Sequence, residues 1–142
     1  MKKNYFFKTS LLMIPTMAFL LMSNSSGKSG AFSGSPGDGG TSCTACHSGG
    51  NFGASLAITH NIPDTGYLLN TNYDVTVTGS SSATAHGFQM TAEKVDDNSK
   101  IGTLIAGTTS SLTNGNANIT HTNSSNNAWT FQWKSPTTDQ GR

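Results

Sequence analysis

Two cysteines and an adjacent histidine form the most chemically specific pattern in the chain. They occur as Cys43-Thr44-Ala45-Cys46-His47, and the 142 residues contain no other cysteine. This is the C-x-x-C-H pattern of c-type haem attachment. Each thiol can add to one vinyl group of a haem, and the neighbouring imidazole can bind the iron as its proximal ligand. The pattern therefore predicts one covalent haem c on Cys43 and Cys46, with His47 bound to its iron.

Two other kinds of site use the same three residues. In an oxidising compartment nearby thiols tend to pair, so Cys43 and Cys46 could form a small-loop disulfide or a redox-active C-x-x-C. A thioredoxin-type motif opens a helix between alternating strands and helices, and no such alternation surrounds this motif. A zinc site would need a fourth ligand from elsewhere in the chain. Both alternatives stay open beside the haem.

The second axial position of such an iron has four candidate ligands, three histidines and one methionine: His121, Met90, His86 and His60. His121 ranks first because it lies in a short predicted strand among polar residues. Met90 ranks second; it shares a strand face with Phe88 and could equally fill space in the core. Water in an open position is the remaining choice. Thioether ligation would give the iron a higher potential than a second imidazole.

Electron transfer is the simplest function for a haem with both axial positions filled by protein. No arginine lies near the motif, and Arg142 is the only one in the chain, so nothing marks a peroxidase. We expect an electron carrier or a binding domain rather than an enzyme. Its partner would be a redox protein, a neighbouring haem subunit or a second copy of the chain. A haem enzyme or small-gas sensor with an open iron site is a third hypothesis.

Residues 1–26 have the features of a secretory signal peptide. Three early lysines precede the apolar run Leu11–Met22, and small polar residues follow. The run is shorter than the ~20 residues of a membrane-spanning helix, so we expect cleavage, between Met22 and Ala31. Without those three lysines, five of the eight basic residues remain against seven acidic ones. The charge indicates no nucleic-acid partner. We expect a periplasmic, cell-surface or extracellular protein, the compartment in which bacteria attach haem.

The composition predicts an all-β fold. Only 11% of residues are charged, 34% are hydrophobic, and no segment after residue 26 has helical periodicity. Residues 27–51 are Gly-rich, and we expect a loop without helix or strand. Short runs at roughly ten-residue spacing in 52–142 predict an antiparallel β-sandwich. We expect Ser110–Ala117 to be a polar loop. Six strands are expected: Ala54–Thr59, Tyr73–Thr78, Ala85–Ala92, Thr103–Ala106, Asn118–Thr122 and Ala128–Lys134.

The apolar positions of these strands predict the core of the sandwich. Seven large apolar side chains are expected in it: Leu56, Ile58, Val75, Val77, Phe88, Trp129 and Phe131. The sequence ends in a turn after Lys134, which would leave a sheet edge unpaired. We therefore expect a sequence that stops short of at least one further strand.

Several blocks resemble a group of secreted bacterial proteins with a reeler-like β-sandwich, the choice-of-anchor V domain, preceded by a haem-type motif. The similar blocks follow the order of that domain and cover roughly residues 30–142: Gly34–Gly50, Tyr73–Thr78, Gly87–Ala92, Thr120–Thr122 and Trp129–Trp133. The resemblance implies an Ig-like or reeler-like sandwich. It also implies a further strand and a surface-sorting region that this sequence lacks.

The resemblance leaves the biochemical role open, because that group has no well-defined activity and a fold is weak evidence for function. Reeler-like sandwiches otherwise suggest adhesion or binding at the cell surface. The alternative to a cytochrome is therefore a binding domain, in which the haem is structural or Cys43 and Cys46 form a disulfide.

Overall fold

The computed structural model describes residues 26–47 and 50–140. The predicted signal peptide lies outside them except for Ser26. No helix among the described residues is long and apolar enough to cross a membrane. The described chain contains two short 3-10 turns, η1 (Pro36–Asp38) and η2 (Cys43–Ala45), and seven strands: β1 (Ser55–His60), β2 (Asn72–Ser80), β3 (Gln89–Met90), β4 (Thr103–Ala106), β5 (Ser110–Thr113), β6 (Asn118–His121) and β7 (Ala128–Lys134).

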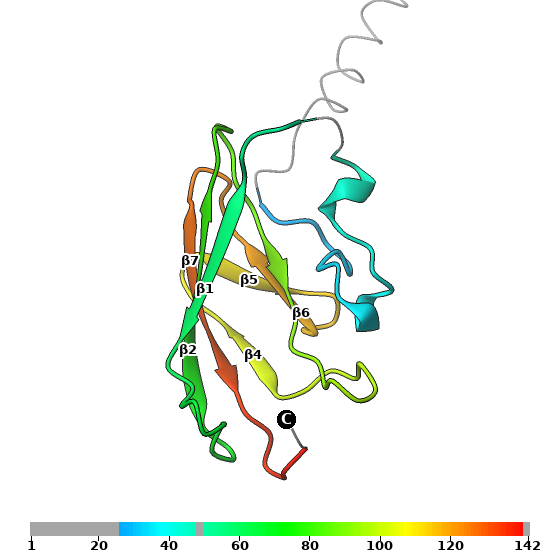
Figure 1. Cartoon of the computed structure of the whole chain (residues 1–142), viewed down its shortest axis with the longest axis vertical. Coiled ribbons are helices and arrows are strands. Elements are labelled where there is room, and N and C mark those ends of the chain that lie inside the picture. Colours follow the sequence, from blue (N-terminus) through cyan, green and yellow to red (C-terminus); the bar gives the residue numbers. More distant parts are fainter. Residues whose placement is uncertain (1–25, 48–49, 141–142) are drawn as a thin grey trace, which may run out of the picture.

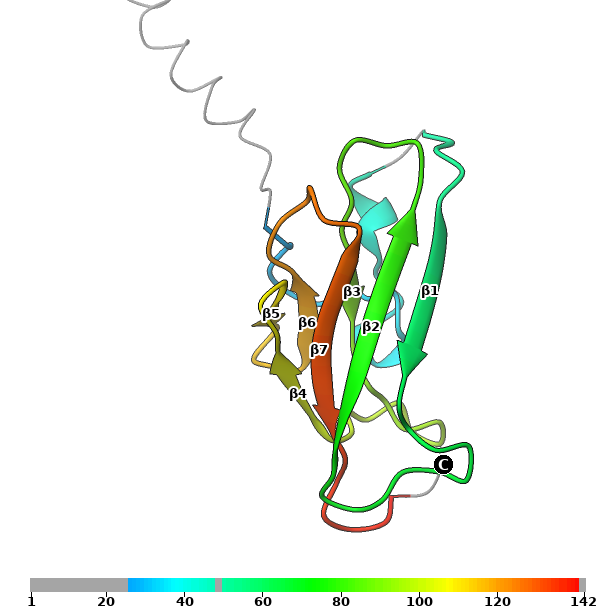
Figure 2. The same ribbon diagram turned by 90° about the vertical axis from the view of Figure 1, so that its left-hand side faces the viewer.

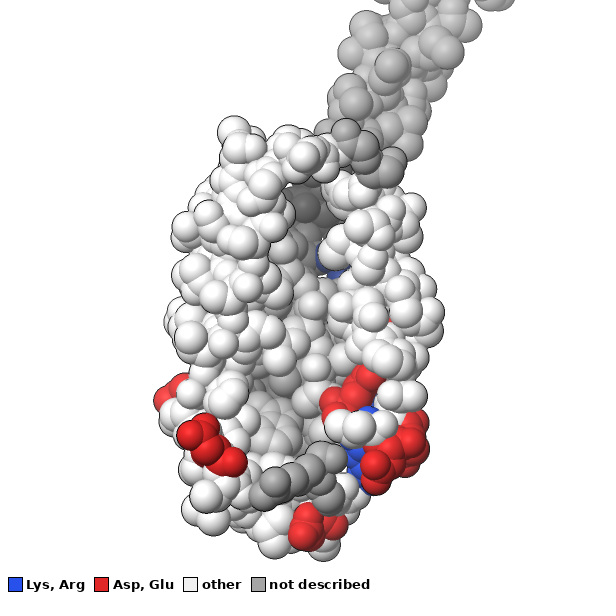
Figure 3. All heavy atoms as spheres, viewed as in Figure 1, with Lys and Arg blue, Asp and Glu red and all other residues white. Residues whose placement is uncertain are grey.

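The strands form two antiparallel sheets, as the all-β prediction requires. One sheet has the order β1-β2-β7-β4 and the other the order β3-β6-β5. Figures 1 and 2 show the two sheets from perpendicular directions, with the Gly-rich segment, blue to cyan, beside the smaller one. The surface is hollowed between that segment and the β1 side of the molecule (Figure 3).

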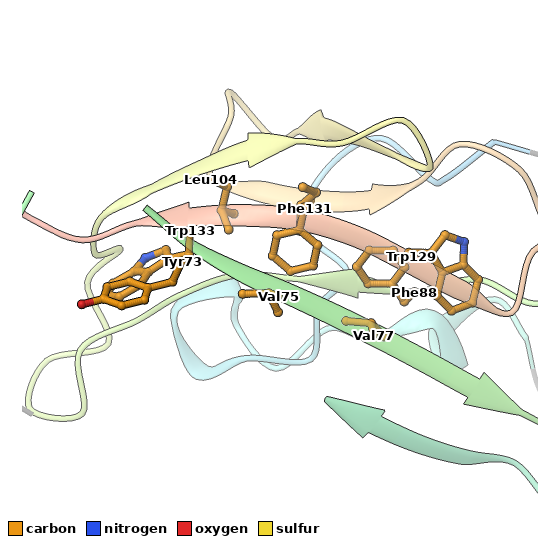
Figure 4. Packing of buried hydrophobic residues seen from close by; sticks show 9 residues of the cluster. Tyr73, Val75, Val77, Phe88, Leu104, Trp129, Phe131 and Trp133 are labelled. Atoms are coloured by element: carbon orange, nitrogen blue, oxygen red, sulfur yellow. The ribbon is translucent and has the colours of Figure 1, made fainter. Parts of the chain in front are cut away.

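The core lies between the sheets and is dominated by β2 and β7. Alternate residues of each strand are buried, and the register places Val75 opposite Phe131 and Val77 opposite Trp129. Phe88 packs on both aromatic rings, with centroids 5.0 Å from Trp129 and 6.1 Å from Phe131 (Figure 4). These five side chains are buried, which confirms their predicted place in the core.

The other two predicted core residues are not in the core. Leu56 is 62% exposed and Ile58 is 47% exposed. Both lie on β1, which is the outermost strand of its sheet and pairs with β2 alone. All six residues of β1 are exposed, so the opposite sheet, which ends at the two-residue β3, does not cover it. The alternation of β1 predicted a strand correctly, but alternation cannot tell which sheet edge the partner sheet covers.

Two further elements differ from the prediction, and hydrogen bonds explain both differences. The expected loop Ser110–Ala117 begins with β5, whose buried Ser110 hydroxyl donates to Thr130 O at 3.0 Å. The expected strand Ala85–Ala92 is reduced to β3, because His86 N donates to Ser124 O and not to a neighbouring strand. The expected loop 27–51 contains the two 3-10 turns and one isolated bridge between Ser33 and Ser42.

Candidate functional site

The C-x-x-C-H motif is folded into a single tight turn. The Ser42 side chain caps η2 by accepting from Thr44 N, and His47 N donates to Cys43 O at 2.9 Å. Cys46 N also donates to Cys43 O, at 3.2 Å. Because the chain returns on itself within five residues, both thiols and the imidazole can face one ligand. Both cysteines are free and exposed.

A cavity of about 390 Å³ lies between this turn and the sandwich. Cys43, Cys46 and His47 line it, and so do His86 and His121, which are far from the motif in sequence. Its volume falls within the range of small-molecule sites, roughly 300–1,000 Å³. The remaining lining mixes apolar and polar groups: Ser26, Lys28, Phe32, Ala85, Gly87, Phe88, Gln89, Thr120 and Ser124. The structure thus brings together the proximal candidate and two of the four distal candidates.

The ring of His121 is held in place on three sides. Its Nδ1 lies 3.2 Å from Phe88 N and 3.3 Å from Phe88 O. This nitrogen can accept a hydrogen bond from Phe88 N or, when it carries the proton, donate one to Phe88 O. Its ring centroid lies 6.3 Å from that of Trp129. Gly87 covers another side, because a Cβ there would fall 2.3 Å from His121 Cε1. Nε2 makes no hydrogen bond to any of the described residues.

The other distal candidates differ in position. His86 lines the same cavity, but its Nε2 lies 2.9 Å from Ser81 Oγ and shares a hydrogen bond with it. Met90 and His60 line a second cavity of about 260 Å³ between the two sheets, and neither lines the cavity of the cysteines. Of the four candidates, therefore, His121 and His86 are the two placed beside the motif.

A polar cluster fastens the Gly-rich segment to the sandwich. Lys100 Nζ lies 2.5 Å from Asp38 Oδ1 and 2.6 Å from Glu93 Oε1. Asn118 Nδ2 donates to Asp38 Oδ2 at 2.5 Å, and Ser35 Oγ donates to Glu93 at 2.6 Å. These contacts join residues separated by 58 to 80 positions in most cases. The cluster holds the segment that carries both cysteines against β6 and the loop before β4.

The hydrogen bonds of this cluster govern its ionisation. The Asp38 side chain is only 1% exposed. Burial opposes its ionisation, but hydrogen bonds from Lys100, Ser33 and Asn118 outweigh burial and lower the pKa of Asp38 to about 2. Burial is outweighed in the same way at Glu93, whose pKa is lowered by hydrogen bonds from Lys100 and the Gly-rich segment. Both carboxylates are therefore charged at neutral pH.

Residues 27–32 also pack onto the smaller sheet. Gly27 N donates to His121 O at 2.9 Å, and Gln89 Nε2 donates to Lys28 O at 3.0 Å. Phe32 N donates to Gln89 Oε1. These contacts place Lys28 and Phe32 in the cavity lining. Sequence inspection missed Asp38, Lys28 and Gln89, because no local pattern shows contacts across more than 50 residues.

Comparison with known proteins identifies the sandwich. A family model described as the Reeler domain matches residues 58–142. This chain belongs to the reeler family. The reeler match begins after Cys43, Cys46 and His47, so family membership does not bear on the motif itself, although it includes His86 and His121 of the cavity lining. The finer resemblance to the choice-of-anchor V group stays a prediction.

One solved structure, the human F-spondin reeler domain (fragment 1), is 17% identical, with a TM-score of 0.39. The similarity covers 58% of this chain and 64% of that one, so the chain spans just under two thirds of the F-spondin fragment. No curated protein matches the chain. Membership of the reeler family agrees with the binding-domain alternative, and none of these comparisons concerns a haem.

Proposed function

We propose that this protein is an exported β-sandwich that holds one haem c covalently and transfers electrons. One observation carries the proposal: Cys43, Cys46, His47 and His121 line a single cavity. Two thiols and two imidazoles are the side chains that a c-type haem with two histidine ligands requires. The apolar rings of Phe32 and Phe88 in the lining suit a flat apolar group. When bound, the haem supplies a one-electron iron couple.

The protein residues would each have a distinct role at this site. Cys43 and Cys46 would each add a thiol S–H across one vinyl double bond, giving two thioethers. His47 would be the proximal ligand. His121 would be the distal ligand through Nε2. Its Nδ1 would then carry the proton and donate to Phe88 O in place of accepting from Phe88 N, the arrangement that commonly orients a ligating histidine. Met90 faces the other cavity, so the lower potential of bis-histidine ligation is expected.

The absorption spectrum of protein made with haem-attachment machinery tests this proposal. A low-spin spectrum that does not change when carbon monoxide is added to the reduced protein supports two protein ligands. His121→Ala should open one position, giving a high-spin component and rapid carbon monoxide binding. His86→Ala is the matched control, since its Nε2 is hydrogen-bonded to Ser81. A low-spin spectrum retained in His121→Ala and lost in His86→Ala would reverse the assignment of the distal ligand.

The second candidate function is a binding or adhesion domain without a functional haem. Reeler membership favours it, and so does the apolar cavity between the sheets, which Ile58, Tyr67 and Trp133 help to line. In this case Cys43 and Cys46 would form a disulfide in the oxidising compartment. A colourless protein with no free thiols, produced alongside active attachment machinery, would support this function and exclude the cytochrome.

Export is part of both proposals. Reeler domains occur in secreted and extracellular proteins, which agrees with the signal-like residues 1–26. A redox protein or a neighbouring haem subunit would be the electron-transfer partner. Both cysteines are exposed, which supports a haem that such a partner could approach from the side of Cys43 and Cys46.

A further inference from the structure

The cavity of the cysteines contains one cationic side chain and no anionic one. Lys28 is the only lysine or arginine in its lining, and no aspartate or glutamate lines it among the described residues. Figure 3 shows lysine or arginine atoms inside the hollow on this face. The ion pairs in the described part of the chain all use Lys100, so none of them neutralises Lys28. The cavity is therefore complementary to an anion.

Hydrogen bonds hold the backbone of Lys28 beside the smaller sheet, while the residue itself is exposed. Lys28 O accepts from Gln89 Nε2 at 3.0 Å, and the preceding Gly27 N donates to His121 O at 2.9 Å. Gly27 has no room for a side chain, since a Cβ there would lie 1.9 Å from Thr120 Oγ1. The Lys28 Nζ lies 5.8 Å from the centroid of the Phe32 ring. An ammonium beside an aromatic wall fits a ligand with a flat apolar body and a carboxylate.

We propose that Lys28 binds a carboxylate of the group held in this cavity, namely a propionate of the haem. The inference rests on the proposed function and adds a residue to it. Cys43 and Cys46 would hold the vinyl side of the ring, and the same ring carries two propionates elsewhere on its edge. Lys28 is a separate element of the lining, contributed by the segment that precedes the motif. It would neutralise one propionate and orient the ring in the cavity.

The test compares holoprotein variants at pH 7 by redox titration and by resonance Raman spectroscopy. Lys28→Met should leave one propionate unpaired, and its negative charge stabilises the oxidised iron. We expect the reduction equilibrium constant to fall about threefold, which is ~28 mV for a one-electron couple. The propionate bending band should shift with it. Lys28→Arg should keep the reduction equilibrium constant and the propionate band close to those of the wild type, because a guanidinium also pairs with a carboxylate. Lys134→Met, which changes a lysine outside both cavities, should alter neither.

Three results would overturn the inference. One is a propionate band that is the same in Lys28→Met and wild type, even if the potential moves. Another is a change of equal size in Lys134→Met. The third is a mature chain whose intact mass shows that Lys28 has been removed. Failure of the proposed function itself looks different, because the wild-type protein would then carry no haem and none of these comparisons could be made.

Discussion

At the scale of single residues, backbone contacts and close packing restrict the ring of His121. Phe88 contacts its Nδ1 from the backbone, and Gly87 lies against the ring where no side chain would fit. Its histidine type suggested a ligand, but the fixed ring and its place beside the motif became visible only in the folded chain. Nothing near residue 121 in the sequence indicates that Gly87, 34 positions earlier, shapes its surroundings.

Gly87→Ala should disturb this arrangement. The new Cβ would lie 2.3 Å from His121 Cε1, so the ring or the backbone must move. We expect a loss of about 1–3 kcal/mol in the free energy of unfolding, the usual cost of overpacking. Denaturant unfolding of the haem-free protein measures it.

Gly79→Ala is the matched control for that substitution. Its Cβ would meet Trp129 at 3.6 Å, an ordinary contact distance, so its stability should change little. Equal stabilities for Gly87→Ala and Gly79→Ala would contradict the close packing of His121 against Gly87.

At the scale of elements, the polar cluster determines where the motif lies. Asp38 lies in η1, within the Gly-rich segment. Lys100 from the loop before β4 and Asn118 from β6 bind Asp38, and Glu93 of the same loop shares Lys100, so a local sequence pattern could not reveal the cluster. The strands themselves were more predictable, since alternating apolar residues indicate β2 and β7 directly. β5 was missed because it is mainly polar, and its one buried residue, Ser110, is hydrogen-bonded to Thr130 O.

Asp38→Asn should destabilise the protein at pH 7 and reduce its sensitivity to acid. The pKa of Asp38 is about 2 in the folded chain, against 3.8 for the ordinary group. A lowered folded-state pKa gives stability that is present above pH ~4 and lost as pH falls through ~2. Allowing for solvent screening, the contribution is on the order of 1 kcal/mol.

Unfolding measured between pH 7 and pH 2 tests this prediction. The wild type should lose stability between about pH 4 and pH 2 more steeply than Asp38→Asn. Asp64→Asn, a change in an exposed turn, serves as the control and should follow the wild type. Parallel pH profiles for wild type and Asp38→Asn would show that Asp38 contributes nothing as a charged group.

The segment before the motif leads to a prediction about processing. Gly27, Lys28 and Phe32 make main-chain hydrogen bonds to the sandwich, so their removal would break contacts of the folded domain. We expect the signal peptidase to cut before Gly27, at the start of the predicted interval Met22–Ala31. Mass spectrometry of the exported protein gives the mature N-terminus. An N-terminus after Lys28 would contradict the role of this segment.

At the scale of the whole molecule, β2 and β7 each bury alternate residues in the core, whereas all residues of β1 are exposed. The sequence predicted the correct fold class, and five of its seven predicted core residues are among the nine that form the core of the described chain. It could not show that the smaller sheet stops short of β1, because coverage of an edge depends on how two sheets of different width overlap. The cavity of the cysteines lies on the side of the smaller sheet, where the Gly-rich segment packs.

Two threonine substitutions distinguish the edge strand from the core. Leu56→Thr on β1 should change the free energy of unfolding by no more than about 0.5 kcal/mol, as expected for an exposed site. Val77→Thr should cost about 1–3 kcal/mol, because Val77 is 1% exposed and a hydroxyl there would lack a partner. Thermal unfolding of both variants measures the difference. A larger loss for Leu56→Thr would mean that β1 is covered in solution.

The central claim is that Cys43 and Cys46 hold a haem covalently. The most direct measurement is the pyridine haemochrome spectrum of the denatured, purified protein, combined with mass spectrometry of the peptide that contains both cysteines. The account predicts a c-type haemochrome, one haem on that peptide, and loss of both in Cys43→Ala/Cys46→Ala. A peptide of unmodified mass, or one carrying only a Cys43–Cys46 disulfide, from protein made with active attachment machinery would contradict it.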